Sequence, residues 1–574
     1  MQSILDELTE EIKNNNFFEF VRSKYFTNEN DLVVAIATVH NSKIIDVVEF
    51  FKTFPNNNNN FYLAKHIFEK VLPSIEHPVI KVMECVDALF KSADGDMTAG
   101  AVFQSFMKYC SQKQSYSEEA LCVALNSIED WEYFVSPSIV AGASFDIQLW
   151  SDKAIQLILS DQVKVKSQAI IALGEITYDN DITIIKKVIL ALTQAQQSLA
   201  SDEINAKILF STFRIFLNLD SPFNELTELI EAALKLNGDS TIHQTSNIFA
   251  FNVERIPNAL LPVFLESLKK LKGTNLGTLK NVDIGIYNLL KNKMENEAIA
   301  LIETLLLLNK TLTIEQFEMT RSQLFEVENS SVLYKIITKW LLSKKIQLLK
   351  AIEFLSFSND VDEPFQLDMT QVSLLSNEEK IFLTRKIVGW LMLRPITATS
   401  LLISLMNEAS EQVIEEISSL YIYNIMFMNF PNSQKKFVES ILEQQGQIVQ
   451  NQLRIILQKL DSYEQDLNLS LKLLELQPTQ SQKETYSRNH SMKMKSVYKK
   501  AQEKSIFRQL VRHQLILYSN KTISHIHYGN GEVKREVFPM HTFQASVEYP
   551  RLDVLEPHNL DYFIKTFRIE GITE

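Results

Sequence analysis

Residues 151–176 read SDKAIQLILSDQVKVKSQAIIALGEI and carry the most informative pattern in the chain. Apolar residues recur at three- and four-residue steps on both sides of a polar break around Asp161. That spacing predicts two amphipathic helices joined by a short turn. Because one hairpin cannot bury its apolar faces alone, we expect neighbouring hairpins to stack on either side of it.

The helical periodicity extends from Ile4 to about Leu476. Short polar breaks such as Asn237-Gly238-Asp239-Ser240 separate the apolar stretches, and they contain residues typical of helix ends. These breaks are too short to separate globular domains, so residues 1–480 are predicted to form one helical-repeat array. Clear amphipathic stretches are Leu63-Ile67-Phe68-Val71-Leu72, Ile184-Ile185-Val188-Ile189-Ala191-Leu192 and Leu226-Leu229-Ile230-Ala233-Leu234.

The stretch Ser151–Ile176 resembles a HEAT repeat, and residues 78–89 resemble one more loosely. The resemblance implies an α-solenoid of stacked helix hairpins that binds other proteins or peptides, and less often nucleic acid. It also implies that the Asp ends the turn, the Val-Lys pair opens the second helix, and the small residues allow a close neighbour. These roles fall on Asp161, Val165, Lys166, Ala169, Ala172 and Gly174. An irregular all-helical bundle is the alternative.

Composition agrees with a mostly α, folded chain. Of 574 residues, 45% are apolar and 22% are charged, which is too apolar for disorder. Thirteen Gly and fourteen Pro are too few turn residues for a sheet protein of this length. Three cysteines cannot build a disulfide framework. The acidic start has no signal-peptide pattern, and no apolar run is long enough to span a bilayer, so we expect a cytoplasmic protein without a membrane partner.

The composition changes after Pro478. Residues 481–535 contain twelve basic and three acidic side chains, whereas residues 1–480 carry a formal charge of −18. Residues 481–513 are therefore predicted to form a basic helix. From residue 514 the pattern shifts to a period of two, and Asn530-Gly531 lies between two extended runs, which is a strong hairpin signal. We expect residues 514–574 to form a small β-meander of three or four strands with a short helix near Asn559–Phe567, docked on the last helices of the array.

The basic helix is the clearest candidate binding surface. Four of its residues stand four apart and line one stripe, where like charges repel and require a compensating surface. Three surfaces could compensate the stripe: the chain's own acidic array, an acidic protein partner, or nucleic-acid phosphates. The candidate binding residues, for a protein partner or nucleic acid, are Lys493, Lys495, Lys499, Lys500, Lys504, Arg508 and Arg512.

Signatures of catalysis and cofactor binding are absent from the sequence. His525 and His527 stand two apart on a predicted strand and would share one face, so a metal site with His541 is a possible but incomplete pattern. We therefore expect no catalytic residues, no metal and no cofactor, and a small-molecule substrate is not expected. The sequence favours a non-catalytic scaffold or adaptor that binds a protein partner. The alternatives are a nucleic-acid-binding subunit and a metal-dependent hydrolase or nuclease with its site in the C-terminal module.

Overall fold

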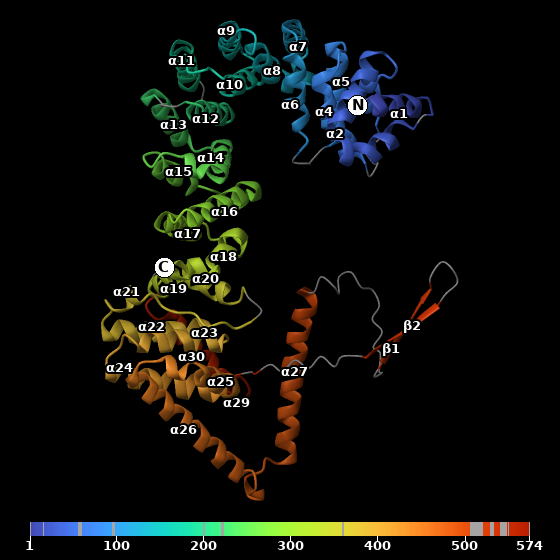
Figure 1. Cartoon of the computed structure of the whole chain (residues 1–574). Helices are drawn as coiled ribbons and strands as arrows, with labels where there is room; N and C mark the ends of the chain where they lie inside the picture. The colour runs from blue at the N-terminus through green and yellow to red at the C-terminus, as the bar shows by residue number, and fades with distance from the viewer. Residues whose placement is uncertain are drawn as a thin grey trace. The chain divides into compact units, whose positions relative to one another are not determined.

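A computed structural model describes residues 2–14, 16–54, 60–93, 98–198, 201–219, 223–358, 361–504, 521–527, 533–539, 548 and 550–572. The chain divides into two compact units, Met1–Leu312 and Thr313–Glu574 (Figure 1). Both are mostly α, as the sequence predicts. Among the described residues, no helix combines the length and apolar character that crossing a membrane requires.

The first unit consists of helices joined by short turns. They are α1 (Gln2–Lys13), α2 (Phe17–Asn41), α3 (Val47–Lys52), α4 (Phe61–Val71), α5 (Val79–Ser92), α6 (Ala101–Cys110), α7 (Gln114–Asn126), α8 (Ile128–Ala143), α9 (Ile147–Ile158), α10 (Val163–Glu175), α11 (Ile182–Ser198), α12 (Asp202–Leu217), α13 (Asn224–Leu236), α14 (Asp239–Asn252), α15 (Leu261–Leu268), α16 (Leu276–Lys291) and α17 (Glu295–Leu308), with 3₁₀ turns η1 (Leu72–Ser74) and η2 (Val253–Arg255).

These helices form two layers. Even-numbered helices from α2 to α16 pack each on the next, and α9, α11, α13 and α15 pack in the same order in the second layer. Successive even helices from α8 to α16 begin 35 to 39 residues apart. Most side chains at the interior of both layers are apolar, and Trp150, Phe213 and Phe249 are among the largest fully buried ones. The first unit is therefore a stacked array of helix hairpins.

The hairpin at 147–175 shows why the stack is tight. Helix α10 begins at Val163, two residues before the Val165-Lys166 pair expected to open it, and Asp161 lies in the turn. A Cβ at Gly174 would lie 2.5 Å from the Cα of Ser211 in α12, so only glycine allows this approach. The close neighbour expected at Gly174 is confirmed, and Ser211 Oγ donates to the Ile170 carbonyl across the same contact at 2.6 Å.

A second device joins one hairpin to the next. Asp202, in the first turn of α12, accepts hydrogen bonds from first-turn N–H groups of α14 and from Thr241 Oγ1 at 2.6 Å. Asp362 of the second unit accepts in the same way from the start of α23 and from Thr397 Oγ1 at 2.7 Å. In each case a carboxylate satisfies unpaired N–H groups at the start of a helix 34 to 39 residues later. The two units therefore share one way of joining hairpins.

The second unit continues with hairpins that are less regular. Its array helices are α18 (Glu318–Leu324), α19 (Ser330–Leu342), α20 (Ile346–Ser356), α21 (Met369–Val372), α22 (Asn377–Leu391), α23 (Pro395–Met406), α24 (Glu411–Glu416), α25 (Pro431–Ile441) and α26 (Gln447–Ser470), with a π-helix η5 (Ile417–Phe427) and 3₁₀ turns η3 (Ile314–Gln316), η4 (Val327–Asn329), η6 (Leu442–Gln444) and η7 (Leu474–Leu476).

The last part of the chain contains a long helix, a hairpin and two short helices. These are α27 (Gln480–Lys504), β1 (Lys521–His527), β2 (Val533–Pro539), α29 (Arg551–Leu555) and α30 (Pro557–Ile569). Strands β1 and β2 pair antiparallel, with Ile523 opposite Val537. The runs expected to add strands, 515–518 and 543–549, lie outside the described residues apart from Glu548. Helix α30 matches the expected short helix, but it packs on α22 in the middle of the unit rather than only on its last helices.

Candidate partner-binding groove and basic helix

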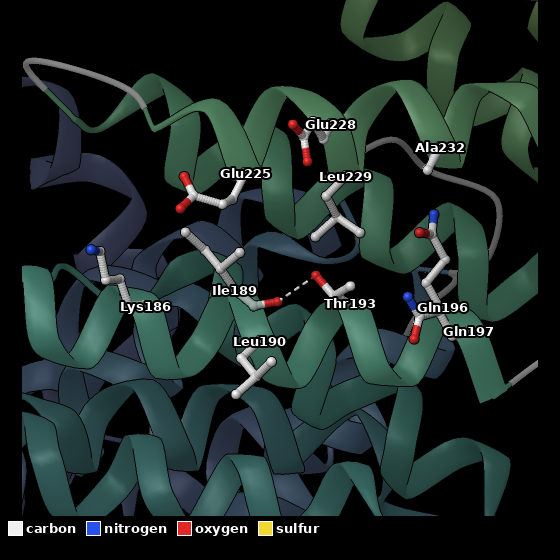
Figure 2. Close-up of a pocket in the computed structure, with 10 residues that line it drawn as sticks. All are labelled: Lys186, Ile189, Leu190, Thr193, Gln196, Gln197, Glu225, Glu228, Leu229 and Ala232. Atoms are coloured by element: carbon white, nitrogen blue, oxygen red, sulfur yellow. Dashed lines mark hydrogen bonds between the residues drawn. The ribbon is translucent and has the colours of Figure 1, made fainter.

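An open groove of about 470 Å³ runs between α11 and α13, two neighbouring helices of the second layer (Figure 2). Both helices turn their apolar stripes toward the even-numbered layer, so Ile189 and Leu229 are almost fully buried at the bottom of the groove. Small side chains at Thr193 and Ala232 leave the space between the two helices unfilled. The groove is therefore a product of the stacking, because each of its walls belongs to a different hairpin.

The walls of the groove are apolar. Leu190 is 59% exposed, so its side chain presents apolar surface to solvent beside the groove. The Thr193 hydroxyl donates to the Ile189 carbonyl at 2.8 Å, drawn as a dashed line in Figure 2. Because its hydroxyl is satisfied within α11, Thr193 is free to contribute its methyl group to an apolar contact. The groove thus offers a hydrophobic strip to a partner.

Charged and amide side chains border this strip. Glu225 and Glu228 project from the first two turns of α13 in Figure 2, with Lys186 on the facing helix near Glu225. Gln196 and Gln197 close the other end. Neither glutamate forms an ion pair with any residue in the described ranges. An apolar strip flanked by two carboxylates suits an amphipathic segment with basic side chains beside its apolar face.

The predicted basic helix is present as α27, and its described side chains are almost all exposed. Lys493 Nζ lies 2.9 Å from Asp553 Oδ2 of α29, so one member of the basic set pairs with the chain's own carboxylate. Lys495 and Lys499 are exposed and pair with no described residue. The side chains of Lys500 and Lys504 are not described although their backbone is helical, and Arg508 and Arg512 lie outside the described residues. Whether the whole stripe forms one surface stays a prediction.

The histidines that suggested a metal site cannot be assembled from the described side chains. His525 and His527 lie on β1, opposite Arg535 and Val533, but their side chains are not described, and His541 falls outside the described residues. This metal site therefore stays a prediction from the sequence.

A different cluster joins His40, Asp46 and His77, whose potential ligand atoms all lie within 4.8 Å of one another. The His40 Nδ1 accepts a hydrogen bond from the Val47 N–H at 3.1 Å. In a neutral imidazole the proton must then be on Nε2, so neither ring nitrogen has a free lone pair in this arrangement. Desolvation by burial lowers the pKa of both histidines, and for His40 the neighbouring His77 adds to this effect. The cluster therefore caps the start of α3, where Asp46 accepts from the Glu49 N–H and His40 from the Val47 N–H.

Sequence reasoning missed both the groove and this cluster. The groove joins residues 28 to 46 positions apart whose types are ordinary for an amphipathic helix, so no local motif distinguishes them. His40, Asp46 and His77 come from the end of α2, the start of α3 and the loop before α5, and no metal-ligand spacing connects them. Only stacking brings either set together.

A scan against protein-family models and a search of curated proteins both find no match to this chain. Arguments about its function therefore rest on the geometry described above.

Proposed function

We propose that this protein is a non-catalytic, cytoplasmic scaffold of the HEAT-like helical-repeat class, which binds a protein partner through its helical array. The α11–α13 groove carries the proposal, because it pairs an apolar strip with two carboxylates that form no ion pair within the described part of the chain. The regular spacing of 35 to 39 residues between successive even helices supports a helical-repeat array, and the HEAT-like assignment rests on the sequence pattern at residues 151–176. The partner segment is a helix with large apolar residues on one face and Lys or Arg beside them.

The energetic argument depends on area and on preorganisation. Burying Leu190 together with a partner leucine removes apolar surface from water, and each fully buried leucine is worth about 1.5–3 kcal/mol. The groove walls are helices fixed by their own hairpins, so little ordering is required when a partner binds. Glu225 and Glu228 add selectivity for basic side chains and speed association, with a modest effect on affinity.

Selection from a displayed library of helical peptides against the full-length protein tests the proposal. The expected consensus contains leucines three or four residues apart with flanking Lys or Arg. Leu190→Glu is expected to weaken binding of the selected peptides by at least about tenfold, which corresponds to the loss of one buried leucine contact. The matched control is Leu159→Glu, which changes a leucine that is 78% exposed in the turn before α10.

Two outcomes would contradict the scaffold proposal. One is a consensus without basic residues, which would remove the role of the two glutamates. The other is equal binding by Leu190→Glu and the wild type, which would place the peptides outside the groove.

A second candidate function is nucleic-acid binding through α27. It is favoured by the exposure of Lys495 and Lys499, which have no partner within the described part of the chain. The protein should then be retained on single- and double-stranded nucleic acid, and this retention should weaken steeply as salt is added. Charge reversal of Lys500, Lys504 and Arg508 should reduce that salt slope. No retention at low salt would eliminate this candidate.

A further inference from the structure

The C-terminal strap, defined here as Glu548 and residues 550–572, packs back onto array helices of the second unit. Glu548 accepts from the N–H groups of Asn432 and Ser433 at the start of α25, both at 3.0 Å. The Leu552 N–H donates to Asn429 at 2.9 Å, and α30 then packs against α22 (Figure 1). The strap is thus attached at several points by polar contacts.

The end of α30 enters a set of side chains that we name the α22 socket: Arg385, Lys386, Gly389 and Trp390 of α22, with Tyr421 of η5. Lys386 is fully buried, and its Nζ donates to the carbonyls of Phe567 at 3.0 Å and Arg568 at 2.8 Å. The last carbonyls of a helix have no partner within the helix, and a cation there is favoured by the helix dipole. Lys386 therefore recognises the C-terminal end of a helix.

Two arginines fix the sequence of the helix that fits. Arg385 binds Glu570 through two parallel bonds of 2.7 and 2.6 Å. In the other direction, Arg568 donates to the Gly389 carbonyl at 2.6 Å and to Glu353 at 2.8 Å. Such forked, charge-assisted pairs are both strong and geometrically selective.

Close packing adds a second requirement. A Cβ on Gly389 would lie 2.9 Å from the Phe567 Cβ and 3.2 Å from the Arg568 nitrogen, so the socket is shaped for the backbone of the bound helix. The Phe567 ring lies 6.1 Å from Tyr421 and 4.3 Å from Phe563, which stands one turn earlier. The bound helix therefore presents two aromatic residues four apart, followed by Arg, any residue, and Glu.

The strap differs from the array helices in how it is held. On α30 only Leu560 is buried among the described residues, whereas α22 buries nine of its side chains. Docking of α30 thus depends on polar groups that water can solvate once the helix leaves, rather than on a buried apolar stripe. A helix held in this way can leave and return without unfolding the array.

We propose that the α22 socket is a recognition site for the C-terminal end of a helix in a partner protein that presents the same aromatic-x-x-x-aromatic-Arg-x-Glu pattern, and that α30 occupies the site in its absence. Because the array groove lies in the first unit, this second surface is independent of the proposed scaffold groove. The strap raises the affinity that a partner needs in order to bind. The partner must compete with a segment that is covalently linked and therefore present at high effective concentration.

The test uses the full-length chain and a fluorescein-labelled peptide of residues 556–572. A variant with Phe567→Ala and Glu570→Lys has a weakened strap and an unchanged socket. It should bind the peptide at least about tenfold more tightly than the wild type, because the internal competitor is weakened. Tyr562→Ala is the matched control, since Tyr562 is 72% exposed on the far side of α30, and it should behave like the wild type.

Exchanging the charges of Arg385 and Glu570 then tests whether the peptide binds in the socket. Adding Arg385→Glu to the strap-weakened variant should abolish binding, and a peptide with Glu570→Arg should restore it. Peptide binding of equal strength by the wild type and the strap-weakened variant would overturn the proposal. The proposal would also be overturned if the wild type formed dimers as its concentration rises and these dimers dissociated when the peptide is added. The helix in the α22 socket would then come from a second copy of the chain.

Hydrogen exchange on the unmodified protein provides an independent measurement that does not depend on variant folding. The amides of α30 should exchange at least about tenfold faster than those of α22, because α30 opens alone. Equal protection of α30 and α22 would show that the strap is a permanent part of the array.

Discussion

Replacing Gly174 by alanine tests whether the close approach of α10 and α12 holds the array together. The added Cβ would lie 2.5 Å from Ser211 Cα and 2.8 Å from its Oγ, well inside the 3.5–4.0 Å of an ordinary carbon contact. Because the nearest atom is backbone, it cannot move aside by changing rotamer. The two helices must separate, which also strains the Ser211 hydrogen bond to Ile170.

Two opposing contributions decide the magnitude for Gly174→Ala. Alanine gains about 0.5–1 kcal/mol over glycine in a helix interior. Overpacking costs about 1–3 kcal/mol, and loss of the hydrogen bond costs about 1 kcal/mol more. We therefore expect a net loss of about 1–3 kcal/mol in the local free energy of unfolding. Hydrogen exchange of the amides of α10 and α12 measures this loss directly, without assuming that both units unfold together.

The matched control for this prediction is Gly277→Ala in the first turn of α16. No heavy atom lies within 4 Å of the position of its added Cβ, so only the helix preference remains. Its variant should be more stable than the wild type by about 0.5–1 kcal/mol. If Gly174→Ala instead slowed hydrogen exchange in α10 and α12 as much as Gly277→Ala slows it in α16, that result would refute the steric explanation of the stack.

Three further predictions concern single side chains. Asp202→Ala should lower the local free energy of unfolding by about 1–2 kcal/mol, because N–H groups at the start of α14 and Thr241 Oγ1 lose their acceptor. Hydrogen exchange at the start of α14 should become faster, and unchanged exchange would show that water replaces the carboxylate. The free energy of unfolding should fall as pH drops below about 6.5, because burial lowers the pKa of folded His40 and the unfolded chain takes up the proton first. Urea titrations at several pH values should show that the free energy of unfolding depends less on pH in His40→Asn than in the wild type. An equal pH dependence would assign the effect to other groups. Ser376→Ala removes the capping box at the start of α22 and should cost about 1 kcal/mol in urea unfolding followed at Trp390, whereas Ser373→Ala, outside the cap, should leave the midpoint unchanged.

Local chemistry predicted several elements of the fold. The stretch around Asp161 indicated a hairpin because apolar spacing reports directly on which face of a helix is buried. The extended runs around Asn530-Gly531 indicated the β1–β2 pairing, and the pattern near Asn559–Phe567 indicated α30. In each case the signal lay within one or two neighbouring elements.

The functional surfaces required contacts between distant residues. Leu190 looks like any apolar helix residue until α13 stands beside α11, and Arg385 finds Glu570 185 positions later. The basic residues of α27 were visible in the sequence because they are local neighbours, yet the pairing of Lys493 with Asp553 was not.

Sequence alone therefore determined that this is a mostly α chain of stacking hairpins with a basic helix near its end, because side-chain periodicity and turn residues act within a few positions. Tertiary structure decided where the α11–α13 groove lies and that α30 occupies the α22 socket, because both sites join residues from distant parts of the chain and their shape depends on how closely helices approach. At Gly174 and Gly389 the absence of a single Cβ sets that approach.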